Sequence, residues 1–175
     1  GQPPVVLAVG RLEPQKDFTT LLKAFNLVRK KKTARLLILG EGSQRQLLEK
    51  QIKTMDLTEF VQMPGYAANP YGFMSRAAVF VLSSAWEGFP SVLVEAMACG
   101  CQLVSTDCPS GPSEILEAGR WGRLVPVGQE NDLANAILDV LYLGRKLDAS
   151  KAAERFSIEN ATKSYLALFS EVFSK

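Results

Sequence analysis

The sequence predicts an α/β domain: an open, doubly wound parallel sheet of about six strands with helices on both faces. Short apolar runs of four or five residues alternate with helical patterns along the chain. The runs lack polar alternation, which is typical of parallel strands buried on both faces. Glycine or proline follows several of them, as expected for loops at strand ends. At 175 residues the chain fits one domain, and we expect residues 1–175 to form it.

Each expected strand is a short apolar run. In chain order the strands are Val5–Val9, Leu36–Leu39, Phe60–Met63, Val79–Leu82, Gln102–Ser105 and Arg123–Pro126. The last run ends in Pro126, which favours an edge position because proline cannot donate a ladder hydrogen bond.

The helices are predicted from caps and from apolar residues at helical spacing. We expect Asp17 to cap the first helix, and Ser43 to cap a second that runs to about Met55. Pro90 suits the first position of a helix that reaches Cys99, and Gly100 suits its end. The other expected helices are Pro70–Ala77, Ser113–Ala118, Asp132–Leu143, Asp148–Arg155 and Ile158–Phe173.

Composition excludes several classes of protein. The net charge is only +2, so nothing in the charge balance argues for a nucleic-acid or membrane-binding surface. The basic cluster Arg29–Lys32 ends a predicted helix, where positive charge complements the helix dipole. No apolar run approaches the roughly twenty residues of a membrane-spanning helix, and no signal peptide is visible. We therefore predict a cytoplasmic location.

The chain has no histidine, the commonest general base and metal ligand. The spacing of Cys99, Cys101 and Cys108 matches no zinc motif, so we predict reduced thiols. We expect no bound metal, and any chemistry to use carboxylates, cations, backbone groups or the substrate.

Two carboxylates are the most informative residues. In open α/β sheets ligands bind beyond the carboxyl ends of the strands, and Glu87 lies on such a loop. Glu95 follows in the next helix and is the only charged residue from Gly88 to Thr106. A carboxylate in an apolar stretch costs free energy unless donors satisfy it, and sugar hydroxyls are such donors. The pair therefore indicates a sugar or ribose site, with Glu87 facing the open cleft and Glu95 deeper beside the helix. The alternative is that Glu87 complements a helix dipole and Glu95 belongs to a buried ion pair.

Two cations lie near the end of the first predicted strand. Arg11 and Lys16 suit a diphosphate, and Gly10 allows the backbone to approach a ligand. The alternative is that both are ordinary exposed loop residues. The predicted helix start after Pro90 offers free N–H groups that also favour an anion.

The run Gly40-Glu41-Gly42 is only weakly similar to a dinucleotide-binding fingerprint. Arg45 stands where the third glycine belongs, and no Walker A loop is present. The sequence therefore argues against a nicotinamide dehydrogenase and a P-loop nucleotidase.

Together these motifs resemble the carboxyl-terminal domain of family 4 retaining glycosyltransferases, which is one Rossmann-like half of a GT-B fold. The resemblance extends from about Val5 to Phe173. Its motifs are Gly10-Arg11-Leu12 with Gln15-Lys16-Asp17-Phe18, Leu39-Gly40-Glu41-Gly42, Glu87-Gly88-Phe89-Pro90 to Glu95-Ala96-Met97, Thr106-Asp107-Cys108-Pro109-Ser110-Gly111-Pro112 with Glu114, and Gly122-Arg123-Leu124-Val125-Pro126.

The resemblance implies a role for each matching residue. Arg11 and Lys16 match the pair that binds the donor diphosphate and stabilises the leaving group. Glu95 matches the carboxylate that takes the ribose hydroxyls, and Glu87 the carboxylate beside the donor sugar. The remaining matches are Gly88, Phe89 and Pro90 for the sugar loop, Ser91, Val92 and Leu93 for the phosphate-binding helix start, and Gly65 and Tyr66 for the loop around the base.

It also implies a nucleotide-diphosphate sugar as donor, a saccharide or lipid-linked acceptor, and no metal. The acceptor-binding amino-terminal domain would be a partner that this chain lacks, so the isolated domain is expected to transfer slowly or not at all. The resemblance implies that the last helix packs toward that domain, and its apolar residues (Tyr165, Leu166, Leu168, Phe169 and Phe173) are expected to be partly exposed here. Membrane contact is expected only through the full-length parent at the inner membrane.

Two other functions remain open at this point. One is a stand-alone, non-catalytic nucleotide-sugar-binding module. The other is a GT-B relative with a different reaction, such as a nucleotide-sugar epimerase or a phosphorylase. A phosphorylase would need a cofactor lysine and a longer chain, and an epimerase lacks this glutamate motif.

Overall fold

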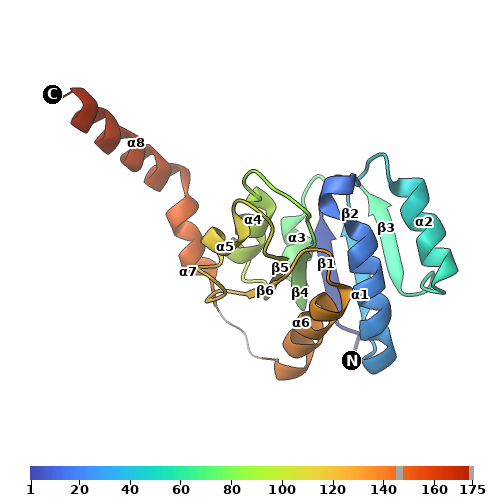
Figure 1. Cartoon of the computed structure of the whole chain (residues 1–175). Helices are drawn as coiled ribbons and strands as arrows, with labels where there is room; N and C mark the ends of the chain where they lie inside the picture. Colours follow the sequence, from blue (N-terminus) through green and yellow to red (C-terminus); the bar gives the residue numbers. More distant parts are fainter. Residues whose placement is uncertain (145–147, 174–175) are drawn as a thin grey trace.

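The computed structural model describes residues 1–144 and 148–173. It contains a six-stranded sheet in the order β3-β2-β1-β4-β5-β6, in which every neighbouring pair is parallel (Figure 1). The predicted fold class and the edge position of the sixth strand are confirmed. The strands are β1 Val5–Val9, β2 Arg35–Leu39, β3 Val61–Gly65, β4 Val79–Leu82, β5 Leu103–Thr106 and β6 Arg123–Val125.

Helices cover both faces of the sheet and enclose two apolar cores. Within β1, Val6 and Ala8 pack into one core while Leu7 packs into the other, because successive side chains of a strand point to opposite faces. The first core contains residues of α1 (Phe18–Lys31), α2 (Arg45–Thr54) and α6 (Glu130–Leu143). The second contains residues of α3 (Tyr71–Met74), α4 (Ser91–Ala98), α5 (Pro112–Ile115) and α7 (Ser150–Ala153).

The strand order reverses beside β1. The chain passes outward from β1 to β2 and β3, and then returns through α3 to place β4 on the other side of β1. The helices that follow β1 and β4 therefore lie on opposite faces of the sheet, with α1 in the first core and α4 in the second. Such a reversal is the point at which open α/β sheets bind ligands.

Close backbone packing explains the glycines that follow β2. A Cβ atom on Gly40 would lie 1.9 Å from the carbonyl oxygen of Gly10, and one on Gly42 would lie 2.5 Å from that of Leu12. Glycine at both positions lets the loop after β2 pack directly against the loop after β1. Their role is thus structural, consistent with the rejection of a dinucleotide fingerprint.

Several element boundaries correct the sequence-based expectations. Asp17 caps α1 as predicted, since its carboxylate accepts from the Thr20 amide at 3.2 Å. Ser43 does not cap α2, because its amide and hydroxyl both donate to Glu13, at 3.0 and 2.7 Å. Glu117 and Ala118 have left-handed backbones, with φ of 47° and 53°, so α5 ends before them at Ile115.

The third strand also differs from its prediction. It begins at Val61 rather than Phe60 and includes Pro64 and Gly65, because Gly65 pairs with Leu39 of β2.

The last helix, α8 (Ile158–Phe173), extends away from the body of the domain (Figure 1). It has no buried residue. The expected exposure of its apolar side chains is confirmed for Tyr165, Leu166, Leu168, Phe169 and Phe173, and Ile158 and Val172 are exposed as well. Among the described residues, no helix is long and apolar enough to cross a membrane.

Candidate functional site

A network of hydrogen bonds surrounds the carboxylate of Glu87 on the loop after β4. Lys16, at the end of the short 3-10 helix η1 (Pro14–Lys16), donates from Nζ to Glu87 Oε1 at 2.6 Å. Ser84 Oγ donates to the same oxygen at 2.6 Å, and Gln15 Nε2 donates to Oε2 at 3.2 Å. The side chains of Lys16 and Glu87 are 14% and 6% exposed, so the pair is nearly enclosed.

Backbone contacts hold the loops after β1 and β4 together around this pair. The Ala85 amide donates to the carbonyl of Gln15 at 2.8 Å, and Ser83 Oγ donates to the carbonyl of Lys16 at 2.7 Å. Thr106 Oγ1, at the end of β5, donates to the carbonyl of Ser84 at 2.6 Å. Both side chains are therefore oriented by main chain on three adjacent strands, which limits the entropy that a ligand would have to remove.

The local charge balance favours an anion. An ammonium group has three N–H donors, and one of those on Lys16 is given to Glu87. The guanidinium of Arg11 makes no ion pair or hydrogen bond in the part of the chain that the structure describes. Both cations therefore keep N–H donors available beside Glu87, while Glu41, which lines the larger cavity, is paired with Arg45.

Two adjoining cavities open at the edge of the sheet where the carboxyl ends of the strands lie, which we call the rim. The smaller, of about 290 Å³, is lined by Val9, Gly10, Arg11, Gln15, Lys16, Glu87, Phe89, Pro90, Ser91 and Val92. The larger, of about 670 Å³, is lined by Val9, Gly10, Arg11, Leu39, Gly40, Glu41, Tyr66, Ala67, Ala68, Pro70 and Tyr71. Val9, Gly10 and Arg11 line both, so the cavities meet at the end of β1. One elongated ligand with an anionic centre would fit this arrangement.

The structure brings most of the predicted site residues together on these cavities. Four of them line neither cavity. Gly65 ends β3 with a φ of 101° and directly precedes Tyr66, and Gly88 directly precedes Phe89. Leu93 is fully buried in the second core, so only its backbone is available to a ligand. Glu95 is half-buried on α4, and its side chain makes no hydrogen bond or ion pair with any described residue.

Glu87 differs in exposure from the expectation that it faces an open cleft. Its side chain is only 6% exposed, because Lys16, Ser84 and Gln15 surround it. The alternative that Glu95 is a buried ion-pair member is not found among the described residues.

The start of α4 has fewer free amides than expected. The Ser91 amide donates to the carbonyl of Phe89 and the Leu93 amide to that of Pro90, both at 2.9 Å. Of these three predicted phosphate ligands, Val92 alone keeps its amide free of hydrogen bonds to described residues.

Sequence reasoning missed some residues of the rim. Gln15 and Ser84 bind Glu87, and each neighbours a residue that the sequence had singled out. Glu41 lines the larger cavity and accepts from Arg45 Nε and Nη2, at 2.7 and 2.5 Å. Hydrogen bonding from Arg45 is the main cause that lowers the pKa of Glu41. Arg45, which stands where the third glycine of the fingerprint would be, thus forms an ion pair with Glu41 beside the larger cavity.

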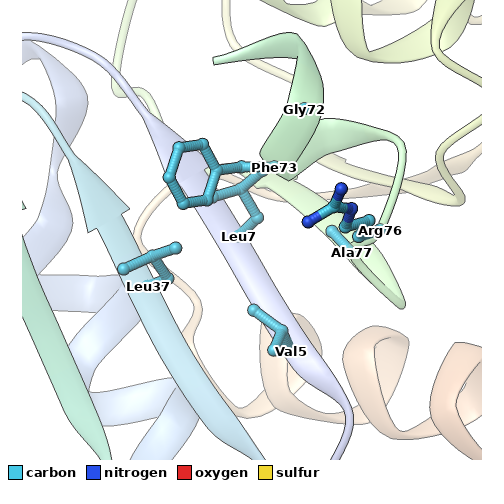
Figure 2. Close-up of a pocket in the computed structure, with 7 residues that line it drawn as sticks. All are labelled: Val5, Leu7, Leu37, Gly72, Phe73, Arg76 and Ala77. Carbon is cyan, nitrogen blue, oxygen red and sulfur yellow. The ribbon is translucent and has the colours of Figure 1, made fainter. Parts of the chain in front are cut away.

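A third cavity, of about 250 Å³, lies away from the rim. Val5, Leu7 and Leu37 project into it from β1 and β2, opposite Phe73 and Arg76 (Figure 2). Of its seven lining residues only Arg76 is charged, and none is a predicted site residue.

All three cysteines are free, as predicted. Burial raises the pKa of the Cys101 thiol to about 12, and the pKa values of Cys99 and Cys108 are also raised mainly by burial. Thiols with raised pKa values remain protonated at neutral pH and are poor nucleophiles. Among the described residues, no group of three or more acidic or cysteine side chains is placed to hold a metal ion.

The fold and this rim define a Rossmann-like α/β domain that can hold an anionic ligand at the reversal point of its sheet. Residues 1–163 match the family model for glycosyl transferases group 1. The chain belongs to this family. The solved structures that it resembles have the GT-B fold.

Curated relatives in the family transfer different sugars. Over 169 residues the chain is 34% identical to the N-acetylgalactosamine-N,N'-diacetylbacillosaminyl-diphospho-undecaprenol 4-alpha-N-acetylgalactosaminyltransferase of Campylobacter jejuni, covering 92% of this chain and 46% of that protein. It is 31% identical to the poly(ribitol-phosphate) alpha-N-acetylglucosaminyltransferase of Staphylococcus aureus, covering 94% of this chain and 35% of that protein. The chain thus spans less than half the length of these relatives.

Solved structures of similar proteins contain UDP. Anabaena Alr3699/HepE in complex with UDP superposes with a TM-score of 0.88 at 25% identity, covering 97% of this chain and 49% of that one. A mutant of S. aureus TarM in complex with fondaparinux, alpha-GlcNAc-glycerol and UDP superposes with a TM-score of 0.84 at 27% identity, covering 95% of this chain and 35% of that one.

Proposed function

We propose that this chain is the donor-binding, carboxyl-terminal domain of a family 4 retaining glycosyltransferase that uses a nucleotide-diphosphate sugar. The observation that carries the proposal is the convergence of Arg11, Lys16 and Glu87 on one cavity at the reversal point of the sheet. The UDP complexes of similar structures support a nucleotide ligand for this rim.

The two cavities suggest how the donor lies. The diphosphate binds where the cavities meet, close to Arg11, and Lys16 reaches it with its remaining N–H groups. The nucleoside extends into the larger cavity beside Tyr66. We assign the ribose hydroxyls to Glu95 from the family resemblance, since it lies one helical turn after Val92, which lines the smaller cavity. The sugar occupies the smaller cavity beside Glu87 and Phe89.

Charge placement suits the chemistry of transfer. When the bond between the sugar and the diphosphate breaks, negative charge grows on the departing phosphate oxygens. Lys16, which is already held by Glu87, stabilises this charge without reorganising, and Arg11 and the free amide of Val92 at the start of α4 add a second cation and a donor.

Glu87 is better suited to hold the sugar than to attack it. Three donors already bind its carboxylate, which lowers its reactivity as a nucleophile. Among the described residues Oε2 accepts from Gln15 alone, so it can also accept from a sugar hydroxyl near the reacting carbon. We assign no nucleophile.

Two observations suggest a second domain: the chain spans less than half the length of the relatives described above, and α8 has no buried residue. An amino-terminal domain would bind a saccharide or lipid-linked acceptor, and the exposed apolar side chains of α8 would pack toward it. Transfer by this chain alone should be slow, because water enters a cleft that lacks one wall. We place the enzyme in the cytoplasm, at the inner membrane where its acceptor is lipid-linked.

Calorimetry with UDP-, GDP- and ADP-sugars, in the presence of EDTA, tests the proposal. Arg11→Ala and Glu95→Ala should each weaken binding by about tenfold or more, from the loss of a charge-assisted hydrogen bond worth roughly 1.5–3 kcal/mol. Arg35→Ala is the matched control, because Arg35 is exposed at the start of β2, the end of the strand away from the rim. Absence of binding by every nucleotide sugar would refute the function, and unchanged affinity in both variants would refute the site.

A further inference from the structure

The segment that leads into α8 contacts the donor rim. Phe156 ends the 3-10 helix η2 (Glu154–Phe156), two residues before α8 begins. Its ring lies against that of Phe89, with centroids 5.6 Å apart and planes inclined by 57°. Phe89 lines the smaller cavity as well. The Phe89 side chain thus lies between the smaller cavity and Phe156, which is 67 positions further along the chain.

Arg155 anchors Phe156 to the body of the domain. Its guanidinium pairs with the carboxylate of Glu117 and donates to the carbonyls of Glu114 and Ile115, at the end of α5. The centre of the same guanidinium lies 4.7 Å from the centroid of the Phe156 ring. Phe156 therefore packs between this cation, the second core and Phe89, and it contacts one side of the Phe89 ring, which remains 51% exposed.

The sugar loop has a second support at Pro90. A Cβ atom on Gly111 would lie 2.4 Å from Cδ of Pro90, so the backbone at Gly111 packs directly against the proline ring. Gly88, in contrast, has no atom within 4 Å of the position of a Cβ. The contacts at Phe89 and Pro90 thus restrain the sugar loop, because the first residue of that loop, Gly88, is not crowded by neighbouring atoms.

We propose that Phe156 is a positioning residue for the sugar end of the donor site. It acts through Phe89, which lines only the smaller cavity. The inference rests on the proposed function in one respect, namely that the sugar occupies the smaller cavity. Removal of the Phe156 ring should loosen the sugar loop and weaken binding of a nucleotide sugar, while binding of the nucleotide alone should change little.

Hydrogen exchange and calorimetry on the same variants test this role. In Phe156→Ala without ligand, the amides of Ser91 and Leu93, which donate to Phe89 and Pro90 of the sugar loop, should exchange at least threefold faster, whereas those of β1 and α1 should not change. UDP-N-acetylglucosamine should bind about two- to tenfold more weakly, the range expected for loss of one aromatic pair, and UDP should bind within twofold of the unaltered chain. Phe156→Tyr keeps the ring and should restore both properties. Phe169→Ala, on exposed α8, is the control and should change neither.

Each outcome decides the inference. Unchanged exchange at Ser91 and Leu93 in Phe156→Ala overturns it, as does an equal loss of affinity for UDP and UDP-N-acetylglucosamine. Faster exchange throughout α4 and α7 would show a merely structural role and would also overturn it. Should the unaltered chain bind neither probe, the proposed function fails for this donor, while exchange still decides whether Phe156 positions the loop.

Discussion

The ion pair between Lys16 and Glu87 makes a quantitative prediction about stability. Lys16→Met keeps most of the aliphatic side chain but removes the charge that lies 2.6 Å from Glu87 Oε1. The carboxylate, 6% exposed, then lacks a counter-ion and cannot easily reach water. Lys16→Met should therefore be less stable than the unaltered chain, although the side chain itself packs similarly.

The expected magnitude lies between two limits. Exposed ion pairs contribute about 0–1 kcal/mol, whereas breaking a fully buried pair costs about 3–5 kcal/mol. Glu87 would retain the donors Ser84 and Gln15, so we expect Lys16→Met to lower the free energy of unfolding by about 2 kcal/mol. For a domain of this size that corresponds to a fall in Tm of roughly 4–8 °C.

A double-mutant cycle separates this electrostatic effect from packing. Urea denaturation of Lys16→Met, Glu87→Gln and the double variant supplies the four free energies of unfolding. The double variant buries no unpaired charge, so it should recover at least half of the loss seen in Lys16→Met. A loss below about 0.5 kcal/mol in Lys16→Met, or losses that simply add, would show that the pair is not coupled as the structure implies.

Three further predictions concern the fold. Gly40→Ala should lower the free energy of unfolding, measured by urea denaturation, by about 3 kcal/mol, because its Cβ would lie 1.9 Å from the carbonyl oxygen of Gly10. Gly72→Ala is the control: no atom lies within 4 Å of its Cβ position, so it should be neutral or slightly stabilising. Burial raises the pKa of the Cys101 thiol from 9.0 to about 12, so the unfolded chain loses this proton first as pH rises. The free energy of unfolding should therefore fall by about 2 kcal/mol between pH 8 and 10.5. The variant Cys101→Ala should lack this contribution. Deletion of the chain from Ile158 onward should change Tm by less than about 2 °C, because α8 has no buried residue. The exposed apolar side chains of α8 should make the unaltered chain self-associate as its concentration rises, and the deletion should abolish this association in analytical ultracentrifugation.

Each of these has a contrary result. Equal stability of Gly40→Ala and Gly72→Ala would show that the loops after β1 and β2 do not pack as closely as described. A pH dependence that is the same with and without Cys101 would remove its thiol as the cause, since lysine and tyrosine titrate in both proteins. A large fall in Tm on deletion of α8 would show that the helix packs against the domain in solution.

The sequence predicted the local elements well because their signals act over a few residues. Apolar runs located β1 and β4 with their observed bounds, and Asp17 capped α1 through a hydrogen bond to an amide three residues later. It failed at Ser43, whose hydroxyl had a stronger partner in Glu13, thirty positions earlier. No local rule could identify that competitor, because it depends on how the loops after β1 and β2 pack.

The candidate site, too, has features that local sequence signals predict and features that only tertiary packing decides. The sequence by itself determined which residues follow the strands, and therefore that Arg11, Lys16 and Glu87 lie on the carboxyl rim of a parallel sheet. Only the tertiary structure decided that Lys16 and Glu87, 71 positions apart, form an ion pair, that Ser84 and Gln15 enclose the carboxylate, and that Phe156 supports Phe89. Periodicity and capping report interactions within one or two turns of chain, whereas burial and pairing depend on which strands become neighbours. Here the return of the chain through α3 made β4 the neighbour of β1, and that adjacency created the site.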